Sequence, residues 1–135
     1  MGMNIGCLNH NPYTLENYAK IERDCYHQYI SDDIDTAEKG IINLIQTANE
    51  FKEAGFKGLD YKIIFSFSYV RLYFIYSHKG LPEKAESYLN QAKQIIIEKC
   101  DFTGNTLEQE TLNVIDFLNQ IDDRNEIAWK KNKRS

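Results

Sequence analysis

The side chains that could carry out catalysis or bind a metal are few and widely spaced. The three histidines, His10, His27 and His78, form no HxxxH or HExxH pattern, and the chain contains no glycine-rich phosphate-binding loop. Asp24, Cys25 and His27 are close in sequence, but side chains at these offsets diverge around a helix, which argues against a Cys/His pair. The sequence therefore predicts a protein that is not an enzyme and that needs no cofactor.

The three cysteines predict neither a metal site nor a disulfide framework. Cys7, Cys25 and Cys100 are an odd number, with no CxxC and no zinc-ligand spacing. We expect each to be a small apolar residue or a stray thiol. Ile5-Gly6-Cys7 resembles the end of a bacterial lipoprotein signal, but the apolar segment of such a signal is missing. We expect a cytoplasmic protein; the alternative is a bacterial envelope protein in which Cys7 is a trimmed lipoprotein cysteine.

The remaining charged groups are expected to face solvent. His78 is placed near the C-terminal end of a predicted helix, where the helix dipole and solvent explain it. The neighbouring acids Asp122 and Asp123 are interpreted as a solvated helix face, as are Glu108 and Glu110. With 20 acidic and 16 basic side chains the net charge is -4, so no general nucleic-acid footprint is present.

The elements that must position these groups are all predicted to be helices. Apolar residues recur at spacings of three and four along most of the chain, and the length of 135 residues fits one domain. We expect a flexible segment over residues 1–13 and a single helical domain over residues 14–135. The expected helices cover residues 15–30, a stretch from Asp33 or Asp35 to Ala54, residues 59–78, residues 82–99, and a fifth segment capped by Asn105 or Thr106 and bearing apolar residues as far as Trp129.

The third helix is predicted to be the central element. It is apolar nearly all round, which indicates packing on several sides. Its longest apolar stretch, residues 63–76, contains Arg71, whereas crossing a bilayer takes about 20 apolar residues, so no membrane span is expected. The fifth helix is expected to present Leu112, Ile115, Leu118 and Ile121 as an apolar stripe that covers the fourth.

The pattern that says most about the type of fold lies in residues 69–92, which read YVRLYFIYSHKGLPEKAESYLNQA. This run resembles one tetratricopeptide repeat, a family of paired antiparallel helices stacked into interaction scaffolds. The matching positions are Tyr69, Leu72 and Tyr76 in the first helix, Gly80 in the turn, and Ala85, Leu89 and Ala92 in the second. Tyr73 departs from the repeat, which usually has a small residue there, and the closing proline is absent near Ile97.

The resemblance implies a right-handed stack of two hairpins with a C-terminal capping helix; the alternative is an ordinary five-helix bundle. It also implies a non-catalytic module that binds a peptide or a helix of a partner protein. Phe67, Val70, Arg71 and Phe74 would then face the binding groove, where Arg71 could meet a carboxylate. Three alternatives stay open: these residues are covered by the first helix or the N-terminal segment, the chain forms a homodimer, or it is a small inhibitor or immunity-type protein.

Overall fold

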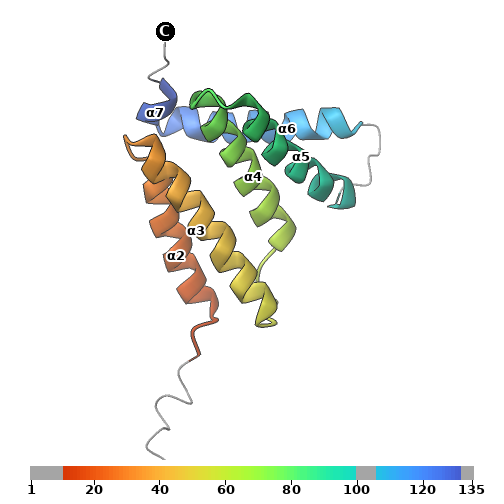
Figure 1. Ribbon diagram of the computed structural model, residues 1–135. Coiled ribbons are helices and arrows are strands. Elements are labelled where there is room, and N and C mark those ends of the chain that lie inside the picture. Colours follow the sequence, from red (N-terminus) through yellow and green to blue (C-terminus); the bar gives the residue numbers. More distant parts are fainter. Residues whose placement is uncertain (1–10, 100–105, 132–135) are drawn as a thin grey trace, which may run out of the picture.

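The computed structural model describes residues 11–99 and 106–131 (Figure 1). Nearly all of the predicted flexible segment 1–13, the Cys7 motif, His10, Cys100 and the alternative cap Asn105 lie outside these ranges. Within them the fold is all-α, and no strand occurs. The helices are α2 (Leu15–Tyr29), α3 (Ile34–Glu53), α4 (Tyr61–His78), α5 (Pro82–Lys99), α6 (Leu107–Arg124) and α7 (Ala128–Lys131).

Local capping chemistry explains where most helices begin. The side chains of Thr14, Asp33, Asp60 and Thr106 each accept a hydrogen bond from a backbone N–H in the first turn of the helix that follows. The alternative of Asp35 as the cap of α3 is therefore wrong, and α4 begins two residues later than expected because Asp60 caps it. Gly55 has φ 86°, a left-handed conformation that glycine adopts readily, and α3 ends just before it.

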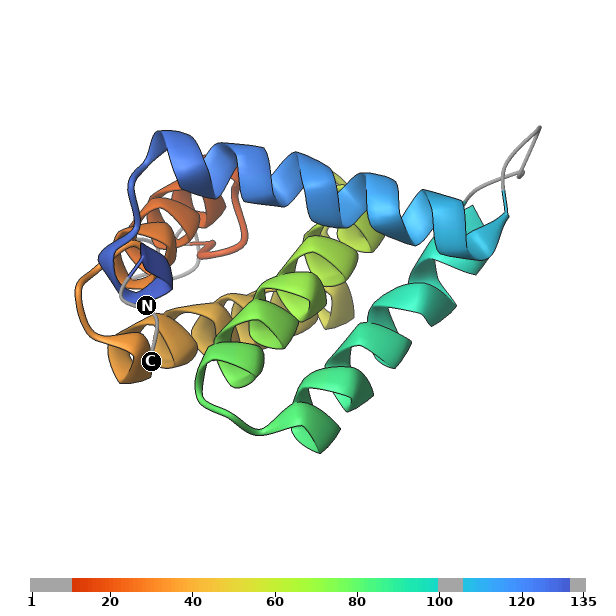
Figure 2. The same cartoon turned by 90° about the horizontal axis from the view of Figure 1, so that it is seen from above.

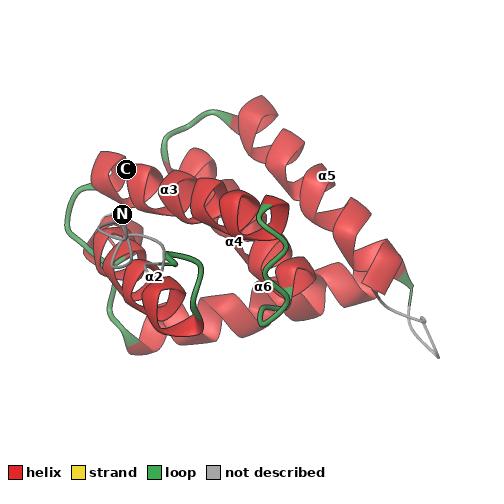
Figure 3. Cartoon of the chain, turned by 90° about the horizontal axis from the view of Figure 1, so that it is seen from below, coloured by secondary structure: helices red, strands yellow, loops and turns green. Residues whose placement is uncertain are grey.

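Four consecutive helices pack in sequence order, each antiparallel to the one before, with α2 against α3, α3 against α4 and α4 against α5 (Figure 1). The helix α6 crosses the ends of this layer and packs against α4 and α5. Figures 2 and 3 show α4 between α5 and the crossing helix α6. The predicted central position of the third helix is thereby confirmed.

The core forms where α4 meets α5. Leu72, Ile75 and Tyr76 on α4 are buried together with Ala85 and Ala92 on α5. The small side chains let the two helices approach closely, while the larger ones fill the space between them. The contacts expected from the hairpin pattern are therefore present.

The C-terminal part differs from the prediction in two ways. Leu112 and Leu118 were both expected on the apolar stripe of the last helix; Leu118 is buried as predicted, but the side chain of Leu112 is 51% exposed. The predicted single helix is also broken: Asn125 caps α6, and Glu126 has φ 51° in the turn before α7. Beyond the break, Trp129 on α7 is buried.

Candidate functional site

The four residues predicted to line a groove lie in different environments. Val70 and Phe74 are 0% and 5% exposed and belong to the main core. Phe67 is half-buried, and its ring centroid lies 5.9 Å from that of Phe117 on α6. Arg71 lies on the side of α4 that faces α2 and lines a cavity there.

This cavity, which we call the Arg71 cavity, has a volume of about 320 Å³ and lies between α2, α3 and α4. The buried side chains of Ile41 and Leu44 on α3 form its apolar part. The helix α2 contributes Ala19, Glu22, Arg23 and Tyr26, and α4 contributes Arg71.

Aromatic rings hold the guanidinium group of Arg71. Its Cζ atom lies 5.2 Å from the ring centroid of Tyr26 and 5.2 Å from that of Tyr29, which is the geometry of a double cation–π contact. The Tyr26 hydroxyl accepts a hydrogen bond of 2.8 Å from Nδ2 of Asn125, which keeps that ring in place. Burial raises the pKa of Tyr26, and the nearby Arg71 charge partly offsets this effect.

One polar atom of the Arg71 cavity has no partner. Nε of Arg71 is buried and makes no hydrogen bond to any residue within the described ranges. Glu22 is the acidic residue of the cavity lining, but its carboxylate accepts from the Tyr18 hydroxyl at 3.4 Å, and it forms no ion pair with Arg71 among these residues. The site therefore holds a fixed cation with an unused hydrogen-bond donor.

A partly exposed apolar stripe lies beside Arg71. Ile63, Phe67 and Arg71 recur at a spacing of four on α4, which places them on one helical face. Ile63 is exposed, and Phe67 contacts the ring of Phe117, which is 48% exposed. The stripe Ile63–Phe67–Phe117 and the Arg71 cavity together make one candidate binding face, which we call the α2–α4 face.

A second polar cluster lies where α7 docks. Asp122 was expected to be solvated, and this prediction is wrong: the residue is 1% exposed. Its Oδ2 accepts hydrogen bonds from the Tyr29 hydroxyl at 2.7 Å and from Nζ of Lys130 at 2.9 Å. Burial and the negative charge of Asp122 raise the pKa of Tyr29 well above its ordinary value. The acid is buried because a cation and a phenol from distant parts of the sequence surround it.

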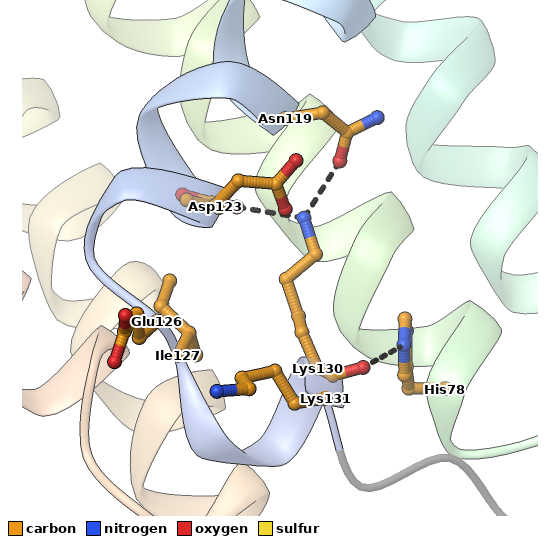
Figure 4. A pocket seen from close by; sticks show the side chains of 8 residues that line it. His78, Asn119, Asp123, Glu126, Ile127, Lys130 and Lys131 are labelled. Carbon is orange, nitrogen blue, oxygen red and sulfur yellow. Dashed lines mark hydrogen bonds and ion pairs between the residues drawn. The ribbon is translucent and has the colours of Figure 1, made fainter.

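The short helix α7 supplies the rest of this cluster. Figure 4 shows Lys130 reaching toward Asn119 on α6, whose Oδ1 accepts from Nζ at 2.7 Å. The ammonium group also lies 4.0 Å from the ring centroid of Phe74. The indole Nε1 of Trp129 donates to the carbonyl oxygen of Tyr29 at 2.7 Å. These contacts fix α7 against α2, α4 and α6.

A cavity of about 490 Å³ opens next to α7 (Figure 4). His78 lines it but is half-buried, so solvent and the helix dipole alone do not explain its position. Its Nδ1 lies 3.1 Å from the carbonyl oxygen of Phe74, and its Nε2 lies 3.3 Å from that of Lys130. Asp122, in the same lining, is already bonded to Lys130 and Tyr29. Both side chains are engaged in holding the fold.

Other chemistry is limited in the described part of the chain. Cys25 is buried, and burial raises the pKa of its thiol, which disfavours the reactive thiolate. Residues 11–99 and 106–131 contain no group of three or more His, Cys, Asp or Glu side chains placed to hold a metal ion. No helix in these ranges is long and apolar enough to cross a membrane.

Comparisons with known proteins identify no relative. No protein-family model matches the sequence, and neither a curated protein nor a solved structure is significantly similar to it.

Proposed function

We propose that this protein is a non-catalytic interaction module that binds a peptide or a helix of a partner protein on the α2–α4 face. The observation that carries the proposal is that apolar side chains and a cavity occur together on this face. Phe117 and Ile63 are exposed there beside half-buried Phe67, and the Arg71 cavity opens next to them. Apolar anchors beside a pocket with a few polar groups are typical of protein-binding sites.

Two further features support the proposal. The antiparallel order of α2 to α5 is compatible with two tetratricopeptide-like hairpins, an arrangement that presents the first helix of each pair on one face. The side chains that could have served in catalysis near α7, His78 and Asp122, are both engaged in contacts that stabilise the fold. A binding role therefore explains the exposed groups with fewer assumptions than an enzymatic one.

A peptide-display selection tests the proposal. We expect the immobilised protein to enrich a family of related peptides of 12 to 16 residues, sized as about four helical turns, and the variant Phe117→Ser to lose them. The matched control is Leu112→Ser, because Leu112 is exposed to a similar extent and lies on a different side of the same helix, five residues before Phe117. Peptides that bind both variants equally, or a selection that enriches no family, would contradict the proposal.

A further inference from the structure

We infer that the occupant of the α2–α4 face is an amphipathic helix whose acidic side chain enters the Arg71 cavity and pairs with Arg71. The inference rests on the proposed function and specifies its ligand: an internal aspartate or glutamate of a helix, rather than a chain terminus or a purely apolar segment.

The charge of the Arg71 cavity favours a carboxylate. Arg23 and Arg71 face the single acid Glu22 in the lining, and the Tyr18 hydroxyl already donates to that acid. The local charge is thus positive in a chain whose net charge is -4. A carboxylate that enters this space meets an uncompensated guanidinium, whereas an amine would meet like charge.

The geometry of Arg71 favours a paired hydrogen bond. A guanidinium group presents Nε and a neighbouring Nη on one edge, which matches the two oxygens of a carboxylate. The buried Nε of Arg71 has no partner within the described residues, so a carboxylate that reached this edge would supply its missing acceptor. The Tyr26 and Tyr29 rings already hold the guanidinium group between them, which lowers the entropic cost of forming the pair.

The length of the face favours a helix over a chain terminus. Ile63, Phe67 and Arg71 follow one another at four-residue intervals, which extends the face over about 12 Å at ~1.5 Å per residue. A helix laid along α4 presents its own side chains at the same spacing, with two apolar residues over the stripe and an acid over the cavity. A terminal residue would fill the cavity but leave the stripe Ile63–Phe67–Phe117 uncovered.

Synthetic peptides test the inference through fluorescence anisotropy with the full chain. The probe is a capped, 16-residue helical peptide with two leucines and a glutamate at successive intervals of four. Two companions replace that glutamate by glutamine, or omit it and end in a free carboxylate at the same place. We expect the glutamate peptide to bind at least tenfold more tightly than either companion, a difference of about 1.4 kcal/mol.

Variants of the protein test whether Arg71 causes the difference in affinity between the peptides. We expect Arg71→Gln to bind the glutamate and glutamine peptides equally, and Arg71→Lys to keep only part of the preference because an ammonium lacks the paired edge. The control Arg124→Gln removes an exposed arginine of α6 and should keep the full preference. If a variant fails to fold, the comparison of the three peptides on the wild-type protein still decides the question.

The other outcomes show whether the inference alone or also the proposed function is wrong. Equal affinity of the glutamate and glutamine peptides for the wild-type protein would overturn the inference, while a Phe117-dependent peptide family would leave the proposed function standing. Preference for the peptide with the free carboxylate would show that the occupant is a chain terminus, which also overturns the inference. If no designed peptide binds and display enriches no family, both the inference and the proposed function are wrong.

Discussion

We expect the ion pair between Lys130 on α7 and Asp122 on α6 to contribute strongly to the free energy of unfolding. Lys130→Met keeps the aliphatic stem of the side chain but removes the ammonium group. The side chain of Asp122 is 0% exposed, so the variant leaves a buried carboxylate with the Tyr29 hydroxyl as its single hydrogen-bond donor within the described residues. Removing one partner of a buried pair typically costs about 3 to 5 kcal/mol.

The contacts of Lys130 place this variant at the lower end of that range. A hydrogen bond to a charged group contributes about 1.5 to 3 kcal/mol and a cation–π contact about 0.5 to 2 kcal/mol, and Lys130 makes both, to Asp122 and to Phe74. Its own side chain is 13% exposed, so water replaces part of the loss. We expect Lys130→Met to reduce the free energy of unfolding by about 3 kcal/mol.

Urea denaturation measures this loss. With a urea m value of ~1.5 kcal/mol/M, the midpoint should fall by about 2 M. The double variant Asp122→Asn/Lys130→Met removes both charges, so we expect it to be more stable than Lys130→Met alone. Lys131→Met, at an exposed position one residue further on, should stay within about 0.5 kcal/mol of the wild type. A Lys130→Met midpoint equal to that of the wild type would refute the reasoning.

Two other predictions concern the packing of α3. Burial alone would raise the pKa of Glu38, but hydrogen bonds from Lys79 and Tyr76 outweigh it and hold the pKa below its usual value. The pKa of Glu38 in the folded protein is lower than the value of about 4.3 for a free Glu. This stabilisation is therefore present at neutral pH and is lost as the pH falls through the folded pKa. Glu38→Gln should therefore be less stable than the wild type at pH 7, and urea midpoints that stay different at pH 2.5 would contradict this. A Cβ atom at Gly40 would lie 2.6 Å from the carbonyl oxygen of Cys25, so Gly40→Ala should lower the free energy of unfolding by about 1 to 3 kcal/mol although alanine favours helix; a higher melting temperature would show that α2 and α3 do not approach this closely.

The features that the sequence predicted well are those that local chemistry determines. The helix Pro82–Lys99 has the predicted bounds because proline suits the first turn and the apolar spacing continues to its end. Thr14 and Thr106 cap their helices through their own side chains. The pairing of α4 with α5 followed from adjacent stripes joined by a short turn at Gly80, which has φ 79°.

The features that the sequence did not predict depend on residues far apart in the chain. Asp122 next to Asp123 has the pattern of a solvated face, and its burial depends on Tyr29, 93 positions away. The docking of Trp129 depends on the same tyrosine, 100 positions away. The apolar residues Ile127 and Trp129 beyond the end of α6 were the available signal that the C-terminus packs against the domain.

The candidate site could be predicted only in part, because its contacts also join residues that are far apart in the chain. Arg71 was identified because the resemblance to a tetratricopeptide repeat places it on the side of the helix that would face a binding groove. Its contacts with Tyr26 and Tyr29 depend on how closely α2 approaches α4, which no local pattern specifies. The surroundings of Phe74 likewise depend on the docking of α7, since Nζ of Lys130 lies 4.0 Å from the centroid of its ring.

The most direct test of a binding site on the α2–α4 face is an NMR titration of the ¹⁵N-labelled protein with a peptide that display has selected. We predict that the Nε–H signal of Arg71 and the backbone amides of Tyr26 and Phe67 shift together and saturate at one peptide per protein. An unchanged Arg71 signal, with shifts confined to residues around the cavity at α7, would contradict the claim.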